Sequence, residues 1–89
     1  MLAPSEALGK ARVYLGEVIP DFAALEPKVE EMVLTHDSSA WNITFYARSG
    51  TISKPETVAD MLSNPKIEKV VSVGANDGAL IAVRNPSPF

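Results

Sequence analysis

The clearest alternation of hydrophobic and polar residues lies in the middle of the chain, over residues 41–48. One side of this segment is apolar and consists of Trp41, Ile43, Phe45 and Ala47. The other side is polar and consists of Asn42, Thr44, Tyr46 and Arg48. Successive side chains of a strand point to opposite faces, so this period of two predicts an antiparallel strand with one buried and one solvated face.

The segment before Pro20 has the hydrophobic spacing of a helix. Apolar residues recur mostly three or four positions apart before Pro20, and the stripe consists of Leu8, Ala11, Leu15, Val18 and Ile19. The spacing predicts an amphipathic helix that Ser5 caps and Pro20 ends. Gly9 and Gly16 fall on nearly one side of this helix, which favours a close approach to the sheet there, with a ligand cleft as the alternative.

Two shorter patterns lie between the helix and the central strand. Residues 21–25 predict one short helical turn whose Phe22 and Leu25 close the end of the core. Residues 28–35 predict a strand with imperfect alternation, because two glutamates are adjacent and three apolar residues are consecutive. A β-bulge or an edge position explains such a pattern.

The second half of the chain predicts a further helix and a hairpin. Ser53 and Glu56 form a capping box with a proline in the first turn, so a short helix is expected over residues 55–63. Strands are expected over residues 68–73 and 79–84. The turn between these strands contains two glycines, which are candidates for a positive φ.

The predicted element order is α-β-β-α-β-β, and the fold class is α+β. We expect a four-stranded antiparallel sheet with the N-terminal helix on one face and a short second helix. A meander is the economical arrangement, because the apolar faces of helix and sheet then meet in one layer. The link between the second and third strands also permits a rearranged strand order. Residues 1–89 are expected to form one domain with loose ends at 1–4 and 85–89.

The amino-acid composition excludes several classes of functional site. The 89 residues are 46% hydrophobic and 21% charged, with no cysteine and one histidine. Without cysteine, thiolate metal sites, iron–sulfur clusters and disulfides are excluded. His36 alone is a poor start for a zinc site, and it lies in a polar turn over residues 36–40, where a solvated role is expected. We therefore predict no catalytic residue, no metal site and no cofactor.

Charge and hydropathy limit the partners as well. The net charge is −3 and the eight lysines and arginines do not cluster, so nucleic acid is not expected as a partner. No apolar run approaches the roughly 20 residues of a membrane span, so no membrane contact is expected. The first residues carry neither a basic nor a long apolar segment. We expect a cytoplasmic protein, or an exported one if a signal has been removed.

Two segments resemble a known family. Residues 41–45 have the form W-x-I/V-x-F, and residues 71–80 resemble a hairpin of the form V-x-V-D-x-x-T-G-E-V-L. Together with the N-terminal helix, this pattern is similar to PepSY and PepSY-like domains. Gly78 and Leu80 match the turn glycine and the apolar position that follows it.

The likeness to PepSY domains covers about residues 6–84, with residues 55–63 as an insertion. Gly74, Asp77 and Ala79 stand where the family has aspartate, threonine and glutamate. The resemblance implies a non-catalytic module, in several cases a peptidase inhibitor or pro-region, and most such modules look exported.

We therefore predict a binding or inhibitor module that acts by protein–protein contact. The alternative is a small ligand-binding protein or minor enzyme that uses the groove between sheet and helix. The candidate partner-binding residues form the polar side of the central strand: Asn42, Thr44, Tyr46 and Arg48. Tyrosine and arginine are enriched at binding hot spots, although an ordinary solvated face has the same pattern.

A second candidate surface is the last strand. Its apolar run contains the assembly candidates Leu80, Ile81 and Val83, and no charge precedes Arg84. If this strand is an edge, it lacks protection and is expected to pair with another protein or with a second copy, giving a homodimer. A central position in the sheet is the alternative explanation of the apolar run.

Overall fold

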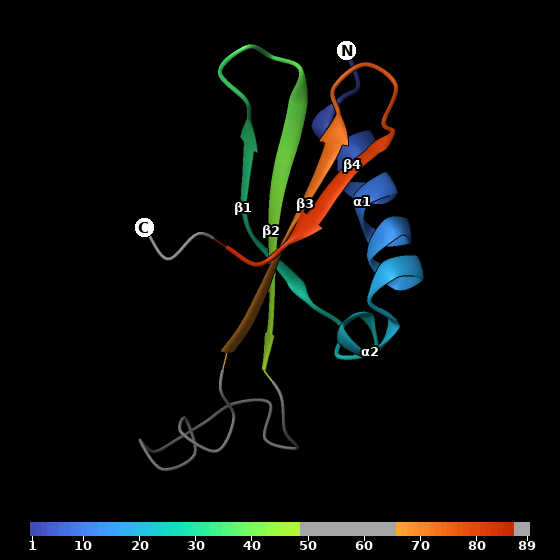
Figure 1. Ribbon diagram of the computed structural model, residues 1–89, viewed down its shortest axis with the longest axis vertical. Helices are drawn as coiled ribbons and strands as arrows, with labels where there is room; N and C mark the ends of the chain where they lie inside the picture. The colour runs from blue at the N-terminus through green and yellow to red at the C-terminus, as the bar shows by residue number, and fades with distance from the viewer. Residues whose placement is uncertain (49–65, 87–89) are drawn as a thin grey trace.

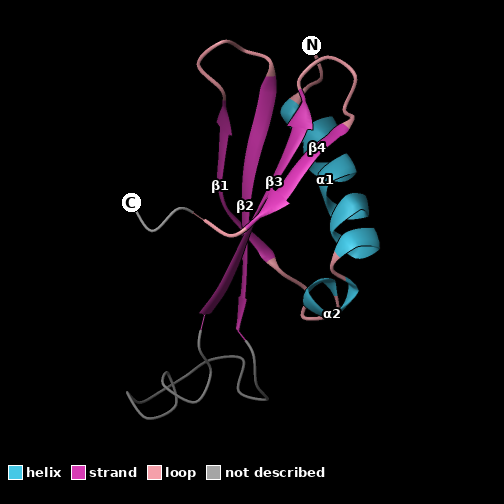
Figure 2. Ribbon diagram, in the orientation of Figure 1, coloured by secondary structure: helices cyan, strands magenta, loops and turns pink. Residues whose placement is uncertain are grey.

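The four strands form one antiparallel sheet with a helix on one face. The computed structural model describes residues 1–48 and 66–86. Its elements are α1 (Pro4–Val18), α2 (Pro20–Ala23), β1 (Lys28–Leu34), β2 (Ala40–Arg48), β3 (Lys66–Gly74) and β4 (Leu80–Arg84). The strand order is β1-β2-β3-β4, and α1 lies against the sheet mainly at β3 and β4 (Figures 1 and 2). The α+β class, the antiparallel meander and the N-terminal helix on one face are confirmed.

The predicted element order α-β-β-α-β-β is not the order of the described residues, in which both helices precede all four strands. The second helix is α2, which begins at Pro20 directly after α1. A proline is well suited to the first turn of a helix, because it lacks the N–H that a helix leaves unpaired there. The helix predicted over residues 55–63 lies outside the described residues.

The start of α1 differs from the predicted Ser5 cap. Pro4 occupies the first helical turn, so Ala3 is the N-cap residue. The Glu6 carboxylate accepts a hydrogen bond from the Ala3 N–H at 3.2 Å, which satisfies one donor at the helix start. Leu2 precedes the cap, and its N–H donates to the Ala75 carbonyl oxygen at 2.6 Å.

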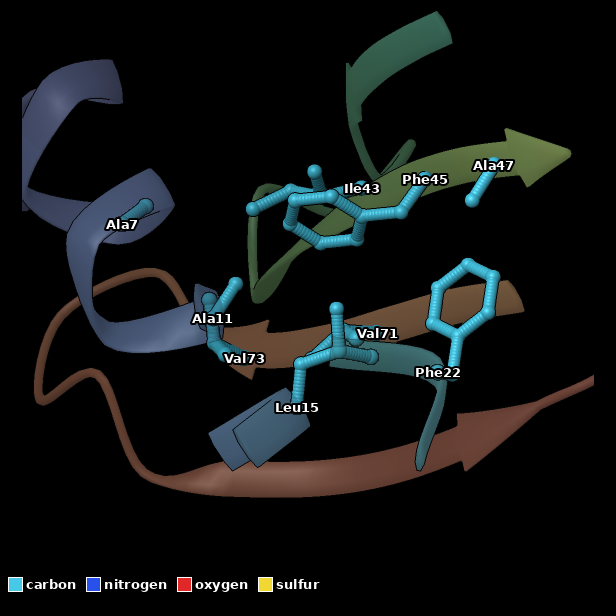
Figure 3. Close-up of a cluster of buried hydrophobic side chains, with 9 residues drawn as sticks. All are labelled: Ala7, Ala11, Leu15, Phe22, Ile43, Phe45, Ala47, Val71 and Val73. Atoms are coloured by element: carbon cyan, nitrogen blue, oxygen red, sulfur yellow. The ribbon is translucent and has the colours of Figure 1, made fainter. Parts of the chain in front are cut away.

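The core lies between α1 and the sheet. The buried residues of α1 are Ala7, Ala11 and Leu15, and they meet apolar side chains of β2 and β3 (Figure 3). The cluster is completed by Phe22, Ile43, Phe45, Ala47, Val71 and Val73. Leu8, Ile19 and Trp41 are partly buried against it, as the predicted stripe and strand face require. Two small alanines on the buried side let the helix approach the sheet closely.

Four positions depart from the predicted core. Val18 and Leu25 are exposed, because α1 ends at Val18 and the chain leaves α2 after Ala23. Gly9 and Gly16 are exposed too, and a Cβ atom at either position would meet nothing within 4 Å. The expected close approach of these glycines to the sheet is therefore wrong, since the alanines occupy that side of the helix.

The hairpin turns follow the sequence closely. The register between β1 and β2 shifts between Val29 and Glu31, which confirms the predicted bulge or edge irregularity. The turn between β3 and β4 contains Gly78 with a φ of 69°, a conformation that glycine adopts without strain. The Asp77 carboxylate accepts a hydrogen bond from the Ala79 N–H at 2.9 Å and closes this turn.

Candidate functional site

The face of the sheet opposite α1 carries no other helix or strand among residues 1–48 and 66–86. We call it the open face. Its β2 residues are the four predicted partner-binding candidates Asn42, Thr44, Tyr46 and Arg48, which alternate with the core residues. The antiparallel register places Ser72, Val70, Glu68 and Lys66 of β3 opposite them, in that order. From β4, Ala82 and Arg84 belong to this face, and from β1, Lys28, Glu31 and Val33 lie opposite Tyr46, Thr44 and Asn42.

Ser72 is the centre of a polar chain that crosses three strands of the open face. Its hydroxyl donates to Asn42 Oδ1 at 2.5 Å and accepts a hydrogen bond from Arg84 Nη1 at 2.6 Å. Ser72 is only 3% exposed, and it is the one buried polar residue among the described ones. A buried hydroxyl without partners would be costly, so both contacts hold Asn42 and Arg84 in place.

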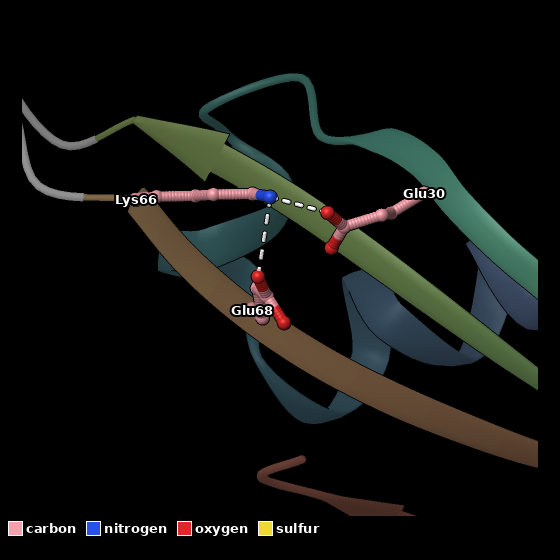
Figure 4. A network of polar contacts seen from close by, with 3 residues as sticks. All are labelled: Glu30, Lys66 and Glu68. Atoms are coloured by element: carbon pink, nitrogen blue, oxygen red, sulfur yellow. Dashed lines mark hydrogen bonds and ion pairs between the residues drawn. The ribbon is translucent and has the colours of Figure 1, made fainter. Parts of the chain in front are cut away.

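A second polar cluster lies at the other end of the open face. The Lys66 ammonium forms ion pairs with Glu30 and Glu68 (Figure 4), and it sits 4.9 Å from the centre of the Tyr46 ring. The hydrogen bond from Lys66 lowers the pKa of Glu30, and the same contact raises the pKa of Lys66. These groups are about one-third exposed, so their contribution to stability is small, but they position the tyrosine ring.

Neither cluster has the arrangement of a nucleophilic active site. The proton of the Ser72 hydroxyl goes to an amide oxygen, which is not a base, and its other partner is an arginine. An activated serine needs a base such as histidine or a carboxylate in that place. His36 is exposed in the β1–β2 turn, and the hydroxyl contacts of Ser72 are with Asn42 and Arg84, not with His36.

The β1–β2 turn is held by Asp37. Its Oδ1 accepts hydrogen bonds from the Ser39 hydroxyl at 2.7 Å, the Thr35 hydroxyl at 2.8 Å and the Ser39 N–H at 3.1 Å. These donors, the Ser39 hydroxyl first, lower the pKa of Asp37. Three hydrogen bonds to one oxygen are a turn-stabilising pattern, and the side chain has a structural part here.

The predicted assembly strand β4 is an edge of the sheet, not a central strand. Leu80 and Ile81 are 38% and 59% exposed, whereas Val83 is partly buried and packs against the core. The register between β3 and β4 shifts near Leu80. Ser72 pairs with Ala82 and Val73 with Leu80, so Ile81 is an extra residue of β4 with no paired residue on β3. The structure thus decides between the two explanations of the apolar run in favour of the edge.

A groove of about 440 Å³ lies between the C-terminal half of α1, the end of α2 and the start of β1. Leu15, Ala23 and Pro27 form its apolar part, and Arg12, Glu26 and Lys28 form its charged part. The Arg12 guanidinium donates to the Pro27 carbonyl oxygen at 3.0 Å and lies 5.3 Å from the centre of the Phe45 ring. The groove lies between the two helices and the α2–β1 connection, and of the described residues that line it only Lys28 belongs to a strand, so it is not the expected groove between α1 and the face of the sheet.

In the part of the chain that is described, no three histidine or acidic side chains gather in a way that could hold a metal ion. None of the described helices has the length and apolar character to cross a membrane. Comparison with protein-family models, with curated proteins and with solved structures finds no match. The resemblance to PepSY domains therefore stays a prediction.

The sequence pointed to the β2 side of the open face but missed the residues that order it. Ser72 and Arg84 were not among the candidates, nor were Lys66 and Glu68. One signal was available: a single serine interrupts the apolar run Val70–Val73. A polar residue that is isolated in a buried strand needs a partner, and here the partners come from two other strands.

Proposed function

We propose that this protein is a non-catalytic binding module, of the PepSY-like inhibitor type, that contacts another protein through its open face. The observation that carries the proposal is the chain Asn42–Ser72–Arg84, which holds polar side chains rigid on a sheet face that no described element covers. Binding costs less when the side chains that make contact are ordered beforehand.

Arg84 indicates what the partner presents. A guanidinium has five N–H donors, and the described contacts of Arg84 use one of them, on Ser72. The remaining donors can take a carboxylate, in the two-pronged geometry that arginine favours. Beside it, Thr44 and Val70 lie opposite each other in the register, and Tyr46 follows on the same strand face. The partner is therefore a protein that brings an acidic side chain against Arg84 and apolar groups against these residues.

Photo-crosslinking tests the face directly. A benzoylphenylalanine in place of Thr44 is expected to capture one protein from extract of the source cells, whereas the same group in place of Asp21 on α2 captures none. The captured protein is then purified and titrated with the parent chain by calorimetry. Its peptidase activity, with and without the chain, tests the inhibitor assignment separately.

Two substitutions decide whether the captured protein uses the open face. Loss of a charge-assisted hydrogen bond is worth about 1.5–3 kcal/mol, so Arg84→Gln should weaken binding by roughly 10- to 150-fold. Asp21 is also exposed, but it lies on α2 and not on the sheet, so Asp21→Asn should leave the affinity unchanged. Equal affinity of the parent and Arg84→Gln, or capture only from position 21, would refute the assignment.

The groove beside α2 supports a second candidate, a small ligand with an apolar body and a carboxylate. Leu15 and Ala23 would contact the apolar part, and Arg12 and Lys28 would face the acid. A medium-chain fatty acid is a suitable probe, and chemical-shift changes confined to these residues would favour this function. Absence of any shift at millimolar acid would dismiss it.

A further inference from the structure

The two edges of the sheet are protected very differently. Both edge strands contain a register shift, but on β1 the side chains of Lys28, Glu30 and Glu31 also carry charges. Edge strands with charges and bulges discourage pairing with another chain. On β4, the residues before Arg84 are all apolar, and Ile81 is 59% exposed. The β4 edge therefore lacks the charge protection of the β1 edge.

Arg84 does not provide that protection. Its guanidinium is bonded to Ser72 at 2.6 Å, so the charge is directed over the open face, not outward from the edge. The register shift near Leu80 leaves Ala82–Arg84 as the regular part of the strand. Such a short edge cannot by itself supply the roughly 800 Å² per partner of a specific interface, so further surface must contribute.

That further surface is a flank of α1. Tyr14 and Lys10 mark the side of the helix next to the β3–β4 turn: the Tyr14 hydroxyl donates to the Gly78 carbonyl oxygen at 2.7 Å, and the Lys10 side chain lies against Gly78. Beside them, Gly9 and Val13 line a hollow of about 210 Å³. Val13 is 59% exposed, which makes this flank apolar as well as concave.

We infer that β4 pairs antiparallel with β4 of a second copy, and that the α1 flanks of the two copies contact each other across the same two-fold axis. When two identical edge strands pair antiparallel, the two-fold axis is perpendicular to the joined sheet. The α1 helices of both copies then lie on the same face of that sheet. The exposed glycines and Val13, which the monomer does not use, then meet their counterparts.

Charge supports a second copy as the occupant. Glu17 follows Lys10 by seven residues, two turns along α1, and both are exposed. A two-fold axis aligns the helices antiparallel, so Lys10 of each copy approaches Glu17 of the other and Val13 lies near the centre. Opposite charges thus meet twice across the axis.

The dimer extends the proposed function without depending on it. The same axis places the two open faces side by side on the other side of an eight-stranded sheet. A partner with two matching sites would then be held at both, with a gain in avidity. The oligomeric state can be measured whether or not the open face binds a partner.

Sedimentation velocity of the full chain tests the inference. The parent is expected to sediment as a dimer at 100 μM, and Ile81→Lys and Val13→Glu as folded monomers with unchanged far-ultraviolet circular dichroism. The matched control is Val33→Lys on β1, a similarly exposed apolar position, 44% exposed, on the opposite edge, which should leave the dimer intact. Lys10→Glu should weaken the dimer at least fivefold, and the double exchange Lys10→Glu with Glu17→Lys should restore it.

Other outcomes overturn the inference. These are a monomeric parent at 100 μM, a series of larger aggregates in place of a dimer, or a dimer that survives Ile81→Lys and is lost in Val33→Lys. If Ile81→Lys fails to fold, hydrogen exchange of the parent decides. Amides of β4 should exchange at least tenfold more slowly at 100 μM than at 1 μM, and equal rates would contradict pairing at this edge.

Discussion

Replacing Phe45 with alanine should remove the largest side chain that is fully buried between α1 and the sheet. Phe45 is 0% exposed in the centre of the cluster, and Arg12 lies over its ring. Truncation of a buried phenylalanine costs about 3–5 kcal/mol, and loss of the arginine contact adds about 0.5–1 kcal/mol. A domain of 89 residues is stable by about 4–13 kcal/mol, so the variant is expected to be marginally folded.

Urea denaturation followed by the fluorescence of Trp41, the single tryptophan, measures this effect. With a slope of about 1 kcal/mol per molar urea, the midpoint of Phe45→Ala should fall by about 3 M or more. The control Val33→Ala removes two methyl groups from an exposed strand position and should shift the midpoint by less than about 1 M. If the two midpoints fall equally, Phe45 does not fill the core as described.

Three further predictions concern the polar contacts. Ser72→Ala should destabilise the fold by about 1–3 kcal/mol in a urea titration, because Asn42 and Arg84 lose their shared partner; a change below about 0.3 kcal/mol would show that the chain is not formed. The pKa of Asp37 is lowered in the fold, so its stabilising contribution is present above about pH 3.8 and is lost as the pH falls through the folded value. Between pH 6 and pH 3 the melting temperature of Asp37→Asn should therefore fall less than that of the parent, and parallel curves would argue against the turn bonds. Trp41 has a buried Nε1 without a partner, so Trp41→Phe should cost under about 1.5 kcal/mol by thermal denaturation.

Most of the predicted elements rest on local periodicity, and local periodicity survives in the structure. The alternation over β2 is retained residue by residue, since one buried face allows only one register. The β3–β4 turn forms where two glycines and an aspartate allow it. At the start of α1 two local preferences differ: serine favours the N-cap position and proline favours the first helical turn. The helix begins at Pro4, so Ser5 lies inside it and Ala3 is the N-cap residue.

The site was predictable only in part. The polar face of β2 follows from sequence alternation, but the hydrogen-bond partner of Asn42, Ser72, lies 30 positions away on β3. The isolated serine in the apolar run Val70–Val73 indicates that Ser72 needs a partner, but the sequence does not identify Asn42 and Arg84 as the partners. The ion pairs of Lys66 with Glu30 and Glu68 likewise depend on the bulge in β1, which brings Glu30 within reach of β3.

The sequence by itself determined the four strands, the N-terminal helix and the apolar side of β2, because periodicity acts over a few residues, and the absence of cysteine excludes thiolate chemistry whatever the fold. Only the tertiary structure decided that β4 is an edge, that Gly9 and Gly16 face away from the sheet, and that Arg84 is held over the open face. Those outcomes depend on which strands pair and on where α1 lies across them. Pairing is selected by the sum of contacts over the whole sheet, so no single segment contains that information.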